Sequence, residues 1–132
     1  MGQEKANLVN EEAIKAVGAY GGGIASSGSI CGILLGGIAL ISSMYSRGNL
    51  NEKENPRMWA LSNKLMEEFE ELAKPYGGIN CSDIAQVDWH DRVAVKNFYI
   101  NPLSNRKKCI KLVGDTAYIL GELLEQEASR NK

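Results

Sequence analysis

The longest uncharged stretch of the chain constrains its fold most. No residue from Ala16 to Ser46 is charged, although eight glycines and several serines interrupt the apolar side chains. The stretch is long enough to cross a bilayer. However, Gly21–Gly23 is typical of a helix break, and the apolar run after it, from Ile30 to Tyr45, has the length of a buried core helix. We therefore predict a glycine-rich central helix inside the protein and no membrane span.

Helical spacing dominates the rest of the chain, and no alternation of period two persists over more than a few residues. These patterns predict one all-α domain over residues 1–132, a bundle of four to five helices around the buried central helix. Pro75 and Gly77–Gly78 would end the amphipathic helix that carries the acidic run at 67–71, which we interpret as a solvated face. The expected helices cover residues 10–20, 30–45, 55–74, 80–86 and 103–127, and residues 87–101 are expected to be irregular.

Charge and composition exclude some classes of partner. The chain has 15 basic and 16 acidic residues, a net charge of −1, and only 7% aromatic residues. A nucleic-acid-binding protein usually shows a basic excess and stacking aromatics, so we expect no nucleic-acid partner. The first residues, Met1–Lys5, are polar and have no apolar core behind a basic start. We therefore expect a cytoplasmic protein without a secretory signal.

The glycine-rich segment Gly21–Ser29 has almost no bulky side chains. The spacing Gly23–Gly28 would open a phosphate-binding loop, but Ser29–Ile30 replaces the required Lys and Ser/Thr. Such a loop can approach a ligand closely, and its N–H groups can stabilise a thiolate. The candidate residues for this approach are Gly21, Gly22, Gly23, Gly28 and Gly32. The alternative is that Gly32 and Gly36 only permit close helix packing.

The three cysteines are the most informative candidates for chemistry. None lies in a Cys-x-x-Cys pair, which excludes a covalent c-type haem and leaves a zinc ribbon or a thioredoxin motif unsupported. Cys31 and Cys81 each fall at a predicted helix start, where the helix dipole favours the thiolate. Cys109 lies on the apolar face of the last helix, so the three could converge, or they could be buried and inert. The single histidine, His90, is a possible further ligand.

Three segments of the chain, together with Cys109, resemble those of a known family. The segments Ala19–Ile24, Cys31–Ile38 and Gly78–Cys81, followed by Cys109 before a terminal helix, are similar to the redox-active C_GCAxxG_C_C proteins. That family is named after its Cys-Gly-Ala-x-x-Gly motif and flanking cysteines, and it also resembles part of the split-Soret cytochromes c. The similarity runs from about residue 10 to about residue 124.

The resemblance implies a helical prokaryotic protein that is redox-active through four cysteines. Cys31, Cys81 and Cys109 match three of them. The fourth is expected on a helix before the glycine loop, which this chain begins too late to contain, and Ile33 stands where the motif has Ala. The cytochrome relatives carry haem and an iron–sulfur centre.

We therefore expect a cysteine-centred redox site that could hold an iron–sulfur cluster and transfer electrons to a redox partner protein. Such clusters normally take four thiolates, so His90, a water or a partner chain would supply the last position. A zinc site of three Cys and one His is chemically possible too. The alternatives are a non-catalytic helical assembly module and a thiol–disulfide oxidoreductase. We also expect a homodimer, because the apolar central helix needs cover on every side.

Overall fold

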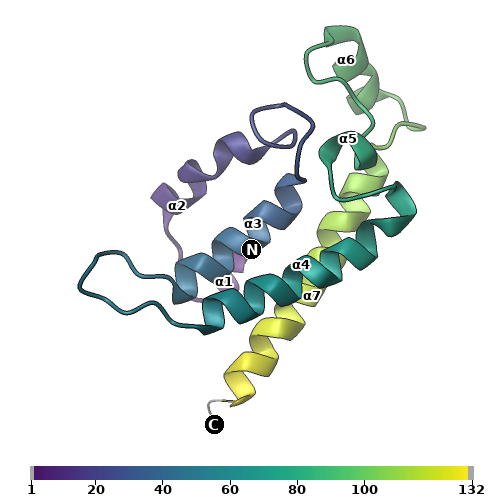
Figure 1. Ribbon diagram of the computed structural model, residues 1–132. Coiled ribbons are helices and arrows are strands. Elements are labelled where there is room, and N and C mark those ends of the chain that lie inside the picture. Colours follow the sequence, from purple (N-terminus) through teal and green to yellow (C-terminus); the bar gives the residue numbers. More distant parts are fainter. Residues whose placement is uncertain (1, 131–132) are drawn as a thin grey trace.

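The computed structural model describes residues 2–130 and confirms the all-α class. Figure 1 shows the helices, and no strand occurs among the described residues apart from one isolated bridge between Ile30 and Asn80. None of the described helices is both long and apolar enough to cross a membrane. The α-helices are α1 (Gly2–Lys5), α2 (Glu11–Ala16), α3 (Gly32–Tyr45), α4 (Arg57–Ala73), α5 (Cys81–Ile84), α6 (Arg92–Ile100) and α7 (Arg106–Arg130), and the 3-10 helices are η1 (Gly18–Tyr20) and η2 (Lys74–Tyr76).

Three helices, α3, α4 and α7, pack against one another and form the core (Figure 1). Apolar residues on α4 recur every three or four positions, so they share one face, and that face is buried. Its acidic residues lie between them toward solvent, as the sequence predicted. The buried residues of α4 are Met58, Leu61, Leu65, Phe69 and Ala73.

The glycine-rich helix α3 is central, but one strip of it, at Gly36 and Ser43, is exposed. Leu34 and Ile41 are buried against the other core helices, whereas Gly36 is exposed. A Cβ atom at Gly37 would lie 2.8 Å from Leu65 Cδ2, so α4 packs directly on the α3 backbone there. Close packing therefore uses Gly37, and the expected burial nearly all round the helix is wrong for the opposite side.

The prediction of irregular structure over residues 87–101 is wrong in part, because α6 forms within it. Asp91 caps this helix by accepting hydrogen bonds from the N–H groups of Val93 and Ala94 at 2.9 and 3.1 Å. Phe98 then buries its ring at 6% exposure. A side-chain cap and one buried aromatic residue thus stabilise a helix whose β-branched and aromatic residues have modest helix propensity.

Candidate functional site

A short antiparallel pairing sets the residues that precede Cys31 and Cys81 opposite each other. The isolated bridge joins Ile30 and Asn80, one residue before each cysteine. Hydrogen bonds flank it, from Cys31 N–H to the Ile79 carbonyl at 2.9 Å and from Cys81 N–H to the Ser29 carbonyl at 2.7 Å. Each paired segment then enters a helix, so Cys31 precedes α3 and Cys81 begins α5. Residues fifty positions apart in the chain therefore start two helices at the same place.

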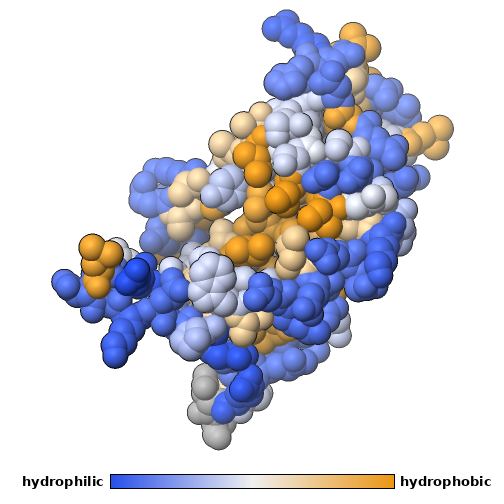
Figure 2. Space-filling view, viewed as in Figure 1, coloured by the Kyte–Doolittle hydropathy of each residue, from blue (hydrophilic) through white to orange (hydrophobic). Residues whose placement is uncertain are grey.

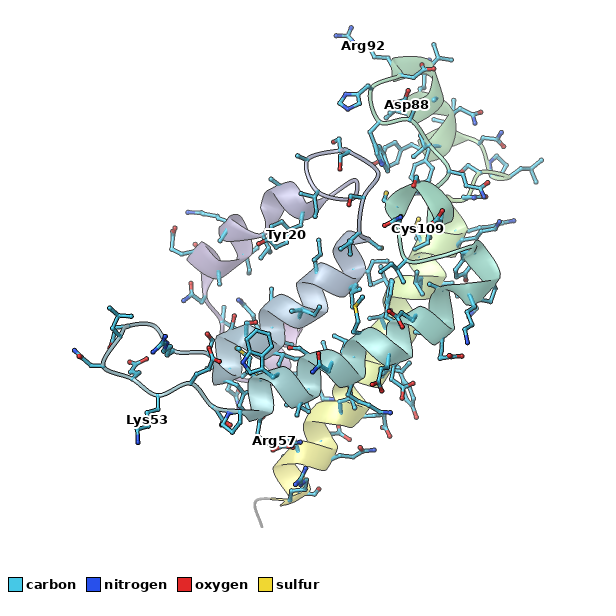
Figure 3. All side chains as sticks on the ribbon, viewed as in Figure 1. Tyr20, Lys53, Arg57, Asp88, Arg92 and Cys109 are labelled. Carbon is cyan, nitrogen blue, oxygen red and sulfur yellow. The ribbon has the colours of Figure 1, made fainter. Side chains whose placement is uncertain are left out.

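Cys109 lies in the first turn of α7, between the two clusters of buried residues that contain the other cysteines. It packs against the core cluster that contains Cys31 and against the smaller cluster of Cys81, Ala85 and Phe98. Figure 3 places Cys109 where α5 meets the beginning of α7. All three cysteines are free thiols.

Burial changes the acidity of Cys31 and Cys109. Desolvation raises the pKa of Cys31, and the neighbouring Cys81 raises it further, whereas the backbone N–H groups of Ile33 and Leu34 lower it. Desolvation, with Coulombic contributions from Cys31 and Cys81, raises the pKa of Cys109 to about 11. At Cys31 the helix start lowers the pKa of the thiol, as expected, but burial raises that pKa by more. The mutual effects also show that the three thiols lie within electrostatic reach of one another.

Trp89 contacts the site and was not among the residues that the sequence suggested. Its indole N–H donates a hydrogen bond to Cys81 Sγ at 3.3 Å. Its ring packs edge-on against Phe98, with centroids 5.2 Å apart. The sequence suggested His90, but the tryptophan beside that histidine contacts the sulfur.

His90 is exposed, and its backbone N–H donates to the Asp88 side chain at 2.9 Å. Within residues 2–130, no three His, Cys, Asp or Glu side chains are grouped so that they could hold a metal ion. Binding of an iron–sulfur cluster or of a zinc ion by the three thiols and His90 stays a prediction.

The glycine loop lies directly against Cys81. A Cβ atom at Gly23 would lie 2.6 Å from Cys81 Cβ, and one at Gly22 would lie 3.3 Å from Trp89 Cδ1. A Cβ atom at Gly28 would lie 3.4 Å from Ser82 Cβ. Only residues without side chains fit these positions, so the loop backbone forms one wall of the site.

The other two glycines that the sequence suggested lie near η1. A Cβ atom at Gly32 would approach the Tyr20 carbonyl oxygen to 2.9 Å, and one at Gly21 would make only an ordinary contact with Gly18. Of the five candidate glycines, Gly22, Gly23 and Gly28 therefore contact residues around Cys81, and Gly21 and Gly32 pack the loop on η1.

The loop backbone has an unusual conformation. Five consecutive residues, 22–26, have φ between +52° and +72°, and three of them, Ile24, Ala25 and Ser26, are not glycine. The left-handed conformation costs a non-glycine residue roughly 1–2 kcal/mol. Hydrogen bonds such as Ala25 N–H to the Ala19 carbonyl at 2.7 Å and Ser29 N–H to the Gly23 carbonyl at 2.9 Å hold the turn. Strain of this kind gathers at functional sites.

The chain also matches a known protein family. Residues 1–123 match the family model described as "Putative redox-active protein (C_GCAxxG_C_C)". No curated protein and no solved structure gives a match. Because the matched region covers nearly the whole chain, this protein belongs to the C_GCAxxG_C_C family.

Proposed function

We propose that this protein is a thiol-based redox protein in which Cys31 and Cys81 exchange two electrons with a substrate disulfide. The observation that carries the proposal is the antiparallel pairing that starts α3 and α5 side by side, with a cysteine at each start. The family description supports redox activity in general. Cys109 packs against the buried clusters that contain these two cysteines, and the indole N–H of Trp89 donates a hydrogen bond to the sulfur of Cys81.

The reaction is thiol–disulfide exchange in two steps. The Cys81 thiolate attacks one sulfur of the substrate disulfide, a mixed disulfide forms, and the other substrate sulfur leaves as a thiolate and takes up a proton. The Cys31 thiolate then attacks Cys81 Sγ, so that a Cys31–Cys81 disulfide forms and the second substrate thiol is released. The substrate gains two electrons and two protons, and a thiol reductant restores both cysteines by the reverse steps.

Burial disfavours Cys31 and Cys109 as the thiol that attacks first. The thiolate is the nucleophile, so a raised pKa slows attack at neutral pH. The pKa of Cys31 and that of Cys109 are both raised by burial. Cys81 also has the indole N–H of Trp89 beside its sulfur, where it can stabilise a developing negative charge.

The test is to oxidise the reduced protein with glutathione disulfide, count the remaining thiols and map the bond by peptide mass spectrometry. We expect the wild type to lose two thiols and to form the Cys31–Cys81 bond. Cys109→Ser should still lose two thiols, whereas Cys31→Ser should stop at a glutathione mixed disulfide on Cys81. A bond that always includes Cys109, or no loss of thiols, would contradict the proposal.

An iron–sulfur cluster for electron transfer is the second candidate, favoured by the meeting of three thiols beside a wall of backbone. It needs ligands beyond those that residues 2–130 bring together. Anaerobic purification followed by iron and sulfide analysis and a visible spectrum tests it. Stoichiometric iron and sulfide that disappear in Cys81→Ser would favour the cluster over thiol exchange, and zinc at the same stoichiometry would favour a structural zinc site.

A further inference from the structure

Positive charge gathers at one end of the molecule, on α6 and at the beginning of α7. Residues 92–114 contain six basic residues and no acidic residue, although the whole chain has a net charge of −1. The acidic residues on either side are already used, since Asp91 caps α6 and Asp115 forms an ion pair with Lys111 at 2.5 Å. All six basic residues are exposed, and they are Arg92, Lys96, Arg106, Lys107, Lys108 and Lys111.

Most of these charges are not neutralised by the protein itself. Within residues 2–130, Arg92, Lys96, Lys107 and Lys108 form no ion pair, and Lys111 is the one member of the six that does. Uncompensated charges of one sign on one surface attract a partner of the opposite sign and speed its association. The charge of this surface therefore favours an acidic partner.

Apolar side chains lie among these charges. The end of α6 and the first turn of α7 surround an open hollow of about 140 Å³, whose lining includes Tyr99, Ile100, Arg106, Lys107 and Ile110. The two isoleucines and the tyrosine are each more than half exposed. Figure 2 shows hydrophobic groups among hydrophilic ones at this end of the molecule, where Figure 1 places α6. Exposed apolar surface with a polar rim commonly marks a contact with another protein.

Two aromatic contacts order this surface before any partner binds. The ring of Tyr99 packs edge-on against Phe98, with centroids 5.3 Å apart, and the guanidinium of Arg106 lies over the Tyr99 ring at 5.5 Å. A side chain that is already ordered loses less entropy on binding. Tyrosine and arginine are also the residue types enriched among those that contribute most to protein–protein affinity.

The same surface borders the cysteine site. Phe98, the neighbour of Tyr99 in α6, packs against Cys81 in the smaller buried cluster. Arg106 and Lys107 share the first turn of α7 with Cys109. A partner bound at this end of the molecule therefore lies next to the thiols of the proposed exchange.

The remaining kinds of occupant fit this surface less well. Small-molecule sites are typically roughly 300–1,000 Å³ in volume, so the hollow is too small to enclose a small disulfide. A single-stranded nucleic acid would stack its bases on free aromatic faces, but Arg106 covers the ring of Tyr99. A lipid surface carries no disulfide for the neighbouring cysteines to reduce.

We propose that this surface docks a protein with an acidic surface next to a disulfide, and that this disulfide is the substrate of Cys31 and Cys81. The inference rests on the proposed function, whose two exchange steps it keeps unchanged. The docked disulfide is reduced to two thiols while the Cys31–Cys81 bond forms. The basic surface thus selects the substrate, and the cysteines carry out the exchange.

The test compares three disulfides that differ in charge. Two are disulfide-bridged peptides of equal length, one with glutamates and one with lysines around the bridge, and the third is the neutral 2-hydroxyethyl disulfide. The rate of Cys31–Cys81 bond formation is measured by acid quenching and mass spectrometry. At low salt the wild type should react about 10-fold faster or more with the acidic peptide than with the basic one. High salt should reduce this preference, because it screens exposed charges.

Two variants with the same change of charge locate the surface. Lys96→Glu/Lys107→Glu reverses two of its charges, and Lys15→Glu/Lys53→Glu reverses two exposed charges elsewhere. Figure 3 shows Lys53 at the opposite end of the molecule from Arg92. The first variant should lose the preference for the acidic peptide, and the second should keep it. Both should react with the neutral disulfide at the wild-type rate, which checks that the fold and the thiols are intact.

The outcomes separate this inference from the proposed function. No Cys31–Cys81 bond with any of the three disulfides would overturn both. A normal reaction with the neutral disulfide but equal rates with the two peptides would overturn the docking surface alone, and binding to phosphatidylglycerol vesicles that Lys96→Glu/Lys107→Glu loses would then assign the surface to a lipid. A wild-type dimer that only Lys96→Glu/Lys107→Glu converts to a monomer would also overturn it, since a second copy would then occupy the surface.

Discussion

The indole of Trp89 is the side chain whose effect on Cys81 can be tested most directly. Trp89→Phe keeps an aromatic ring against Phe98 but removes the N–H that contacts the sulfur. We expect the rate of Cys81 alkylation by iodoacetamide at neutral pH to fall about 3- to 10-fold, as for loss of one hydrogen bond to a developing anion. The rate is measured by mass spectrometry in Cys31→Ser/Cys109→Ser backgrounds.

The second tryptophan provides a matched control. Trp59 is 60% exposed, and its indole N–H donates a hydrogen bond to the Glu54 side chain and not to a cysteine. Trp59→Phe should leave the alkylation rate unchanged, and it leaves Trp89 as the sole tryptophan fluorophore, whose emission should change when Cys81 is oxidised. Equal rates in the two tryptophan variants would refute a role for the indole N–H.

The pKa of Cys109 gives a second prediction for a single residue. It is raised to about 11 by burial and by the two neighbouring thiols. Alkylation of Cys109 should therefore be slow at pH 7 and should keep accelerating up to about pH 11. In Cys31→Ser/Cys81→Ser the Coulombic contributions disappear, so the midpoint should move down toward the ordinary thiol value of 9.0. A midpoint near 9 in the wild type would mean that Cys109 is not buried among thiols.

Local sequence signals predicted the positions of the cysteines but not their surroundings. Helix-start patterns correctly placed Cys31 and Cys81 at the beginnings of α3 and α5. The contact between Trp89 and Cys81 depends on how a loop folds back across α5, which no local periodicity encodes. His90 has the chemistry of a ligand, but its neighbours Asp88 and Asp91 are used in a turn and a helix cap. The sequence shows that His90 has the chemistry of a ligand, but it does not show whether the side chain is exposed.

Among the structural elements, the glycine loop Gly21–Ser29 leads to the most specific prediction. Gly23 has φ of +72°, and its added Cβ would collide with Cys81 Cβ and with the Ser29 backbone. Gly23→Ala should therefore destabilise the fold by about 2–4 kcal/mol, from left-handed strain and overpacking together. It should also change the reactivity of Cys81. Urea unfolding followed by circular dichroism measures the stability.

Gly36→Ala is the matched control, because its added Cβ meets nothing within 4 Å. It should stabilise α3 by about 0.5–1 kcal/mol, the usual gain for Gly to Ala in a helix. If Gly23→Ala were as stable as Gly36→Ala, the left-handed turn would not form as described.

The elements that could be predicted are those with strong periodicity and clear ends. The apolar spacing of α4 and the capping Asn80 before α5 are both local signals, and both gave the correct helix. The left-handed turn at residues 22–26 could not be predicted from the sequence, because Ile24 and Ala25 each disfavour that conformation. Hydrogen bonds to the surrounding backbone, formed only in the folded chain, impose it.

For the whole molecule, we predict a homodimer. Several large apolar side chains on α6 and just after it are more than half exposed, among them Val93, Ile100 and Leu103. Exposed apolar surface commonly marks subunit contacts. Light scattering at micromolar concentration should give about twice the chain mass of 14.4 kDa, and Gly36→Leu should keep that mass. A monomer would contradict this prediction.

The ion pair between Arg57 and Glu127 links the start of α4 to the end of α7, seventy residues apart. Two hydrogen bonds join them, at 2.8 and 2.6 Å, and the Glu127 side chain is only 5% exposed. Glu127→Gln should lower Tm clearly, whereas Glu12→Gln should not, since the exposed pair of Glu12 with Lys15 lies on the surface. Arg57→Met should lower Tm more than the double change Arg57→Met/Glu127→Met, which leaves no unpaired charge behind.

The ion pair between Arg57 and Glu127 also predicts how the stability of the protein depends on pH. Hydrogen bonds and charge from Arg57 hold the pKa of Glu127 below its ordinary value of 4.5. A carboxyl group whose folded pKa is lowered stabilises the protein fully above its unfolded pKa, and that stabilisation is lost as the pH falls through the folded pKa. Tm measured from pH 7 to pH 2 should therefore fall less steeply below pH 4.5 in Glu127→Gln than in the wild type. Parallel curves would show that the acid sensitivity of the fold lies in other carboxyl groups, and that α4 and α7 are joined by their apolar faces alone.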